Sequence, residues 1–204
     1  QVVANLGDDT VRIGNQVRAA TIWGGSGDDS VTVAANGLTG GAAFYAGPGK
    51  DSLVVTGAVQ GSSLFGDDGT GTSADGNDSF VLSSDFSKSY FSGGSGNDIF
   101  SAAATMNASS IYGGVGEDSI TLGAITATSS VLGGADNDVV SVGTVNTGSV
   151  FGEAAADSIL IGNTISRGYL GGGSGNDTLR VSGAVNEATS IIGSTGTDYI
   201  SVGG

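Results

Sequence analysis

Aspartate recurs at one position of a glycine-rich hexapeptide along the whole chain. In Gly93–Asp98, Gly113–Asp118 and Gly172–Asp177 the hexapeptide opens with two glycines, has a third glycine at its fourth position and ends in Asp. The ten aspartates at the sixth position are Asp9, Asp29, Asp51, Asp78, Asp98, Asp118, Asp138, Asp157, Asp177 and Asp198. Hard cations such as Ca²⁺ prefer oxygen ligands of this kind. The spacing therefore predicts a row of cation-binding carboxylates.

The charge of such a row is the main physical problem of this sequence. Two carboxylates one coil apart, at about 4.8 Å, repel by about 1 kcal/mol in water and by several times more in a lower dielectric. The chain has only 6 Lys and Arg against 20 Asp and Glu, and of the six bases only Lys50 lies within a copy of the hexapeptide. Ca²⁺ accepts six to eight oxygens with tolerant geometry, whereas Mg²⁺ requires near-octahedral geometry. Transition metals would lack their nitrogen or sulfur ligands, because the chain contains no His and no Cys.

The elements that position the row follow from the period of the repeat. Successive aspartates are 20, 22, 27, 20, 20, 20, 19, 20 and 21 residues apart, which is typical of one supersecondary unit stacked in a line. Apolar residues stand two and four places after each Asp, as Ile120 and Leu122 do after Asp118. Another stands two places before each hexapeptide, and alternation of this kind indicates half-buried strands. A second turn with an apolar plug, such as Gly123–Ile125, closes each unit.

These features predict an all-β protein, a right-handed parallel β-solenoid (β-roll) of about ten coils of about 20 residues. We expect two strands per coil, one row of Ca²⁺ loops and a single domain over residues 1–204, as a rod roughly 48 Å long. The long interval holds an insertion at 67–75, with the extra acids Asp67, Asp68 and Asp75. It is interpreted as a solvated surface loop, with an additional ion site as the alternative. A start at Gln1 without a signal peptide indicates a segment of a longer chain.

Composition argues against several classes of function. A net charge of −14 is unfavourable for nucleic acid and for anionic membrane surfaces, and no apolar run approaches the roughly 20 residues of a membrane span. Acid pairs such as Asp8 and Asp9 lack an accompanying base or nucleophile, so an enzyme is not expected. Ice binding would need a uniform outward array, but the third and fifth hexapeptide positions vary from Ser26 and Asp28 to Pro48 and Lys50.

The ten copies resemble the RTX (repeats-in-toxin) nonapeptide Gly-Gly-x-Gly-x-Asp-x-apolar-x over essentially the whole chain. The resemblance implies a calcium-bound β-roll that bacteria secrete, usually by type I export. It also implies that the sixth-position Asp binds Ca²⁺ together with loop carbonyls of two adjacent turns. The glycines to which this role carries over are Gly25, Gly27, Gly47, Gly49, Gly94, Gly96, Gly114, Gly116, Gly134, Gly173, Gly175 and Gly196.

The chain departs from the RTX pattern in three places. Family members carry loops on both sides of coils of about 18 residues, whereas this chain has one loop per coil, so a single ion row is expected. The copy Gly152–Asp157 has lost most of its glycines, which predicts a weak or empty site at Asp157. In the copy that ends at Asp138, Asp136 replaces a glycine, and Asp tolerates a left-handed backbone better than most residues.

Large apolar residues form a predicted outward stripe beside the ion row, at the position just before each hexapeptide. They are Trp23, Tyr45, Phe65, Tyr112, Leu132, Phe151 and Ile192. Monomers rarely expose long apolar patches. The stripe therefore predicts either a lateral contact with another rod, domain or flat ligand, or rings that fold over the loops and shield the ions.

Together these patterns predict a calcium-dependent, secreted or cell-surface structural module that folds as Ca²⁺ binds between coils. We expect it to self-associate, head to tail or laterally through the stripe, as part of a bacterial surface layer, adhesin or fibre. The alternative is a calcium-triggered folding and export module of a type I-secreted toxin or hydrolase. A catalytic or membrane-active domain elsewhere in the parent chain would favour that alternative.

Overall fold

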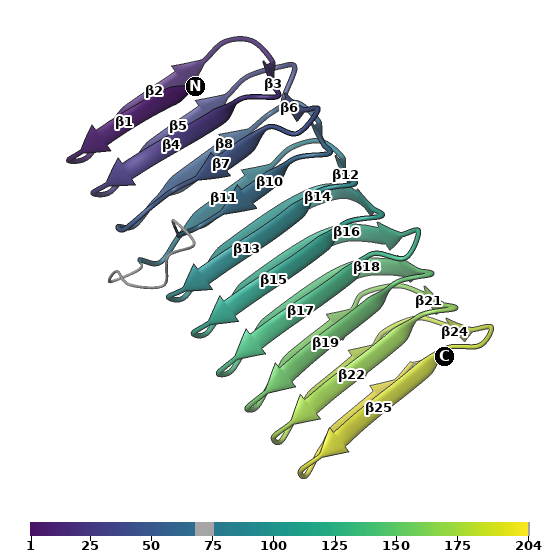
Figure 1. Cartoon of the computed structure of the whole chain (residues 1–204). Coiled ribbons are helices and arrows are strands. Elements are labelled where there is room, and N and C mark those ends of the chain that lie inside the picture. Colours follow the sequence, from purple (N-terminus) through teal and green to yellow (C-terminus); the bar gives the residue numbers. More distant parts are fainter. Residues whose placement is uncertain (68–75, 204) are drawn as a thin grey trace.

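A computed structural model describes residues 1–67 and 76–203 of the chain. The chain winds into stacked coils in which each coil adds one strand to the first of two parallel sheets and one or two strands to the second (Figure 1). The glycine-rich loops line one long edge of the rod, which we call the loop edge. The second turns line the opposite edge, which we call the turn edge. The prediction of an all-β parallel solenoid of about ten coils is confirmed, and the described residues contain no helix.

The first sheet has ten strands, each of which leads into a glycine-rich loop. Its strands in spatial order are β1 (Val2–Leu6), β4 (Thr21–Ser26), β7 (Ala43–Tyr45), β10 (Ser63–Phe65), β13 (Tyr90–Ser95), β15 (Ser110–Val115), β17 (Ser130–Ala135), β19 (Ser149–Ala154), β22 (Tyr169–Ser174) and β25 (Ser190–Thr195). Chain order and spatial order coincide, so every coil pairs with the coils before and after it.

The second sheet has 16 strands and receives the chain as it leaves each loop. Its main strands are β2 (Thr10–Ile13), β5 (Ser30–Val33), β8 (Ser52–Val55), β11 (Ser79–Leu82), β14 (Ile99–Asn107), β16 (Ser119–Thr126), β18 (Val139–Asn146), β20 (Ser158–Ile161), β23 (Thr178–Val181) and β26 (Tyr199–Val202). Two-residue strands near the turn edge complete it: β3 (Val17–Arg18), β6 (Leu38–Thr39), β9 (Val59–Gln60), β12 (Phe86–Ser87), β21 (Ile165–Ser166) and β24 (Val185–Asn186).

These short strands correct the expectation of two strands per coil. The apolar plug of the second turn is itself paired from coil to coil, as Val59 with Phe86 and Val145 with Ile165. In three coils the main strand runs on into the plug, so β14, β16 and β18 extend over eight or nine residues, with a register shift between Ala102 and Thr105 of β14. A plug that must lie at the same depth in every coil is held there by ladder hydrogen bonds.

The core is a narrow column of the inward residues that the alternation predicted. Ile22, Ile120, Leu122, Val131 and Ile161 are all buried. A group of phenylalanines packs edge-on in the middle coils, with ring centroids of Phe80 and Phe91 4.7 Å apart and those of Phe91 and Phe100 4.5 Å apart. Only the two end coils leave such positions open to solvent, as at Ile200 and Val202.

The 27-residue interval does not disturb the register of the coils. Ser52 pairs with Ser79 and Val55 with Leu82, as in coils of ordinary length. The coils on either side of the predicted insertion at 67–75 therefore stack as regularly as the others. Asp68 and Asp75 lie outside the described residues, so the extra ion site considered there stays a prediction.

Candidate cation-binding edge

The sixth-position aspartates form one continuous column along the loop edge, between the strands of the two sheets. Eight of them are no more than 3% exposed: Asp29, Asp51, Asp78, Asp98, Asp118, Asp138, Asp157 and Asp177. Asp9 and Asp198, in the end coils, are half-buried. The carboxylates therefore point into the rod and not toward bulk water.

One oxygen of each carboxylate is committed to the neighbouring coil. The backbone N–H of Asp98 donates to Oδ1 of Asp118 at 2.8 Å, and the N–H of Asp118 donates to Oδ1 of Asp138 at 2.8 Å. Nine such bonds of 2.7–3.0 Å link the ten aspartates without interruption. Each Asp thus accepts from the coil that precedes it, which the sequence did not indicate.

In six of these carboxylates the second oxygen, Oδ2, is buried and has no such partner. Among the described residues, no hydrogen bond reaches Oδ2 of Asp29, Asp51, Asp118, Asp138, Asp157 or Asp177. No ion pair in the described part of the chain joins these six side chains to a base, and the pair Arg167–Glu187 lies at the opposite edge. An ionised carboxylate in this position is left half-satisfied, which is costly in a buried site.

The first glycine of each loop makes the room for this oxygen. A Cβ at Gly113 would collide with Oδ2 of Asp118 in the same coil and with the carbonyl oxygen of Gly133 in the next coil. The same two kinds of oxygen border Gly133, Gly152 and Gly172. A carboxylate oxygen and a carbonyl oxygen from adjacent coils therefore lie against one face of the first loop residue. Sequence reasoning overlooked the part that this glycine plays.

The second and fourth loop positions have a different reason to be glycine. All twelve glycines assigned to the site from the resemblance have φ between 101° and 138°, a region that L-residues rarely adopt. φ is also positive at three such positions where the chain has another residue: Asp136 (φ 74°), Glu153 (φ 86°) and Ala155 (φ 78°). Asp157 also keeps its place, since it accepts from Asp138 at 2.8 Å. Its loop therefore retains the shared conformation despite the lost glycines.

A second ladder runs along the fifth loop position in the opposite direction. Oδ1 of Asn97 accepts from the N–H of Glu117 in the following coil at 3.0 Å, and Oδ1 of Asn77 accepts from the N–H of Asn97 at 2.9 Å. The bonds continue where this position is Asp or Asn, as at Asp8, Asp28, Asn137 and Asn176. The frequent Asn and Asp at this position is the signal that could have revealed it.

Burial raises the pKa values of aspartates in the column, so that they ionise less readily. Desolvation raises the pKa of Asp51 and Asp138 to about 7, against the lowering effect of the backbone N–H that each accepts and with a further rise from neighbouring carboxylates. Desolvation likewise raises the pKa of Asp118 and Asp157 to about 6 and that of Asp78 to about 9. Desolvation is also the largest cause of the raised pKa values of Asp29 and Asp177.

The metal ligands that the column can offer fit a hard cation better than a softer metal. The described residues contain no cluster of three or more Asp, Glu, His or Cys side chains, so each coil can offer one carboxylate and backbone carbonyls. Mixed carboxylate and carbonyl oxygens suit Ca²⁺, and the chain has no thiolate or imidazole for softer metals. A cation held by Oδ2 and the loop carbonyls would supply the positive charge that the column lacks.

The turn edge carries a comparable ladder without charge. The N–H of Ser62 donates to Oγ of Ser89 at 3.1 Å, Ser89 donates to Ser109 at 3.1 Å, and Ser109 donates to Ser129 at 3.2 Å. These serines are buried, and their hydroxyls donate to nearby carbonyls such as Asn107 O at 2.8 Å. A neutral hydroxyl therefore suffices to satisfy a backbone amide of the preceding coil.

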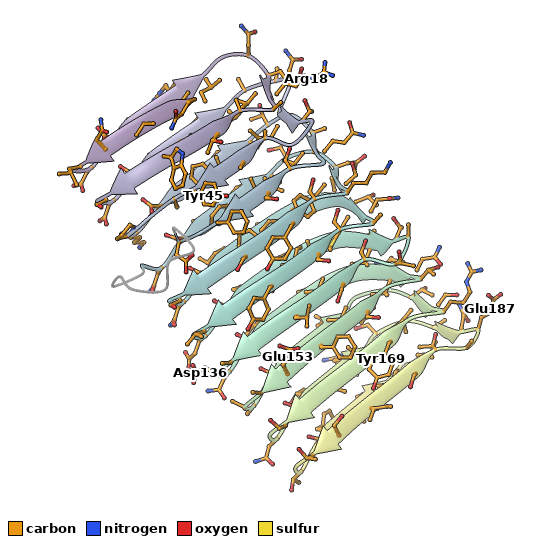
Figure 2. The ribbon with its side chains drawn as sticks, viewed as in Figure 1. Arg18, Tyr45, Asp136, Glu153, Tyr169 and Glu187 are labelled. Atoms are coloured by element: carbon orange, nitrogen blue, oxygen red, sulfur yellow. The ribbon has the colours of Figure 1, made fainter. Side chains whose placement is uncertain are left out.

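The predicted outward stripe lies on the face of the first sheet. Trp23 and Tyr45 stack with ring centroids 4.3 Å apart and planes at 14°, and Tyr45 and Phe65 stack at 4.8 Å and 9°. Tyr45 and Tyr169 project from this face in Figure 2. The rings are half-buried because they cover one another from coil to coil.

Comparisons with known proteins leave the site to be judged on its own geometry. No protein-family model, no curated protein and no solved structure matches the chain. No helix in the described part of the chain is long and apolar enough to cross a membrane.

Proposed function

We propose that this chain is a calcium-dependent structural module of a secreted or cell-surface bacterial protein, similar to RTX β-rolls, which folds as Ca²⁺ binds along the aspartate column. The observation that carries the proposal is the buried Oδ2 without a hydrogen-bond partner, repeated at Asp29, Asp51, Asp118, Asp138, Asp157 and Asp177. A ligand that binds only the folded chain stabilises it by mass action. Ca²⁺ at extracellular, millimolar concentrations suits modules of weak affinity.

The turn edge supports this interpretation by contrast. If the aspartates served only to accept a backbone N–H, a serine would do the same work without charge, as Ser89 and Ser109 do. Every coil nevertheless carries a carboxylate at the loop edge. The residues that would hold Ca²⁺ are these aspartates through Oδ2, with carbonyls of the first loop residues such as Gly133 and Gly152. The bound ion would neutralise the column and tie adjacent coils together.

Lateral self-association through the stripe is the second part of the proposal. The stripe position is small in two middle coils, at Ser92 and Gly171, and in both coils a tyrosine stands two residues earlier. Tyr90 lies 5.8 Å from Phe65, and Tyr169 lies 4.9 Å from Phe151. The aromatic cover is therefore maintained across the gaps, as a contact surface between rods would require.

Calcium titration followed by far-UV circular dichroism at pH 7.5 tests the folding mechanism. We expect a weak β signal in chelator, a strong one in millimolar Ca²⁺, reversal on renewed chelation, and a much smaller response to Mg²⁺. Identical spectra and unfolding temperatures with and without Ca²⁺ would refute it. Analytical ultracentrifugation in Ca²⁺ tests self-association, and a mass that stays monomeric at every concentration would remove the lateral contact.

A further inference from the structure

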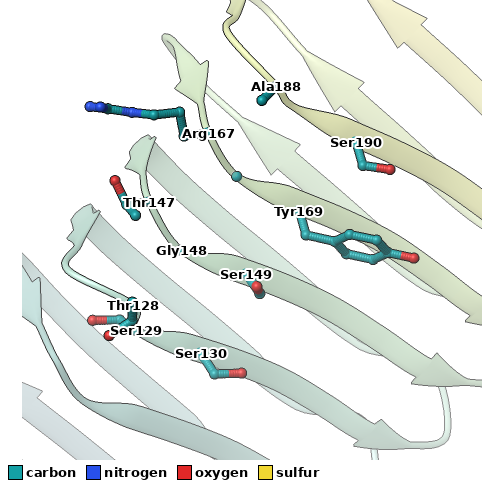
Figure 3. A pocket seen from close by; sticks show the side chains of 11 residues that line it. Thr128, Ser129, Ser130, Thr147, Gly148, Ser149, Arg167, Tyr169, Ala188 and Ser190 are labelled. Atoms are coloured by element: carbon teal, nitrogen blue, oxygen red, sulfur yellow. The ribbon is translucent and has the colours of Figure 1, made fainter.

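A groove lies on the turn side of the first sheet, away from the aspartate column. It has a volume of about 410 Å³ and runs across four successive coils, from Thr128 to Ser190 (Figure 3). Three steps between coils correspond to roughly 14 Å. The volume falls within the range of small-ligand sites.

The groove coincides with an interruption of the serine ladder. The buried ladder position is Ser89, Ser109 and Ser129 in three successive coils, the last of which lines the groove, but in the next two coils it is Gly148 and Gly168. Both glycines line the groove. A Cβ at Gly148 would collide with a methyl group of Ile125, so the core forbids a serine there. The groove therefore lies where the serine ladder is interrupted.

Hydroxyl groups form one wall of the groove. Ser130, Ser149 and Ser190 occupy one register column, together with Tyr169 (Figure 3). The hydroxyls of these three serines have no hydrogen-bond partner among the described residues and are half-buried. Each can both donate and accept. Ser130 and Ser149 belong to neighbouring coils, about 4.8 Å apart, and Ser190 lies two coils beyond Ser149.

Tyr169 and Arg167 supply the other recognition elements. The Tyr169 ring lies over Gly171, where a Cβ would approach it to 3.0 Å, and the ring is supported by Phe151 at 4.9 Å. Nη2 of Arg167 donates to Oδ1 of Asn146 at 3.2 Å, and Nε lies 3.6 Å from Oε2 of Glu187. The guanidinium is thus steadied, and it has further N–H groups to offer.

The lining also limits the charge of a ligand. No carboxylate lines the groove, although the chain carries a net charge of −14. Glu187 partly neutralises Arg167, and the field of the whole rod repels anions. A neutral, hydroxyl-rich ligand meets both the unpaired hydroxyls and the supported aromatic ring.

We propose that this groove binds a short stretch of a neutral polysaccharide chain. The sugar hydroxyls exchange hydrogen bonds with Ser130, Ser149 and Ser190, one sugar ring packs against Tyr169, and Arg167 donates to a ring or hydroxyl oxygen at the turn side. The repeat of the coils, at about 4.8 Å, is close to the length of one sugar unit, so successive sugars meet successive positions of this register column.

The test is calorimetric titration of the whole chain in Ca²⁺, with circular dichroism as the check on folding. The probes are linear neutral tetrasaccharides of β-1,4-linked glucose, α-1,4-linked glucose and β-1,4-linked mannose, with an acidic tetrauronate for comparison. We expect saturable binding of at least one neutral probe in the micromolar to millimolar range. Tyr169→Ala should weaken it about tenfold, and Tyr169→Phe should weaken it much less because the ring remains.

Tyr90→Ala is the matched control. Tyr90 occupies the same register column and also stands two residues before a small stripe residue, Ser92, but it does not line the groove. We expect it to leave binding unchanged. The proposal is overturned if folded protein binds no neutral probe at millimolar concentration, if only the acidic probe binds, or if Tyr169→Ala and Tyr90→Ala have the same effect. Because folding is measured separately, these outcomes are independent of the calcium proposal.

Discussion

The two long edges of the rod satisfy the same backbone requirement with different chemistry. At the loop edge Oδ1 of an aspartate accepts the N–H of the preceding coil, at 2.8 Å for Asp118, and at the turn edge Oγ of a serine does so at 3.1–3.2 Å. The serine uses its single oxygen fully, because its hydroxyl also donates to a carbonyl. The aspartate keeps a second, buried oxygen that the fold itself does not use. Stacking of the coils therefore needs one acceptor oxygen per coil, and the second oxygen of the aspartate is the one that a bound cation would use.

The largest expected effect of this difference is on the pH dependence of stability. The folded pKa values of Asp51, Asp78, Asp118 and Asp138 lie between about 6 and about 9, above an unfolded value of about 4. A raised carboxyl pKa means that the folded state binds protons more tightly. Its contribution is complete below pH 4 and is lost as pH rises through the folded pKa.

We therefore expect metal-free protein to be folded at pH 5 and to lose stability steadily between pH 5 and pH 9. Millimolar Ca²⁺ should abolish most of this loss, because the ion replaces the protons. Thermal unfolding by circular dichroism at five pH values, in chelator and in Ca²⁺, measures both curves. A metal-free protein that becomes more stable as pH rises would show that the column is ionised and satisfied by the chain alone.

The next largest effect should come from filling the space beneath one carboxylate. Gly113→Ala places a methyl group against Oδ2 of Asp118 and the Gly133 carbonyl. The carbonyl belongs to the stacked backbone and the carboxylate is held by the N–H of Asp98, so neither can easily yield. We expect a loss of about 3 kcal/mol in the free energy of unfolding, measured with urea in Ca²⁺. Gly162→Ala is the control, since its nearest contact would be 3.8 Å away, and it should change stability by less than about 1 kcal/mol. Equal losses in the two variants would mean that the first loop glycine is not a packing position.

A smaller effect should follow from removing one charge while keeping the acceptor. Asp118→Asn retains Oδ1 for the N–H of Asp98, so metal-free protein at pH 5 should be almost unchanged. In Ca²⁺ at pH 7.5 the variant should lose about 1.4 kcal/mol of calcium stabilisation, the value for a site at roughly ten times its Kd. Calcium titrations at both pH values measure this.

Asp85→Asn provides the matched comparison for that substitution. Asp85 also accepts a backbone N–H, from Thr105 at 3.1 Å, but it is exposed and lies at the turn edge. Its replacement should leave the calcium response intact. If Asp85→Asn and Asp118→Asn reduce the response equally, the ion senses net charge and not the buried column.

The regular part of the molecule could be predicted because its signals repeat. A period near 20 residues, alternating apolar positions such as Ile120 and Leu122, and Asp at one loop position sufficed for the solenoid, its inward residues and the line of Asp118 and its equivalents. The short strands at the turn edge escaped prediction because two residues per coil give no periodicity. Only pairing with the next coil makes them strands.

The partners of the side chains could not be predicted in the same way. Whether Oδ1 of Asp118 faces the preceding or the following coil depends on loop geometry that no spacing encodes, and the fifth-position ladder in fact runs the other way. The groove beside Tyr169 arises where Gly148 and Gly168 interrupt a ladder that was itself unforeseen. The first loop glycine under each carboxylate, such as Gly113, was not predicted as part of the site, because spacing does not show which atoms a Cβ would meet.

The smallest expected effect is at the turn edge. Ser109→Ala leaves the N–H of Ser89 without its acceptor in a buried site and should cost about 1 kcal/mol. Because no charge is involved, the cost should be the same in metal-free protein at pH 5 and in Ca²⁺ at pH 7.5. Ser110→Ala, which removes a neighbouring hydroxyl that has no partner among the described residues, should cost less than half as much. If the cost of Ser109→Ala instead depended on Ca²⁺, the ion would act on both edges. The inference that only the aspartates respond to the cation would then be wrong.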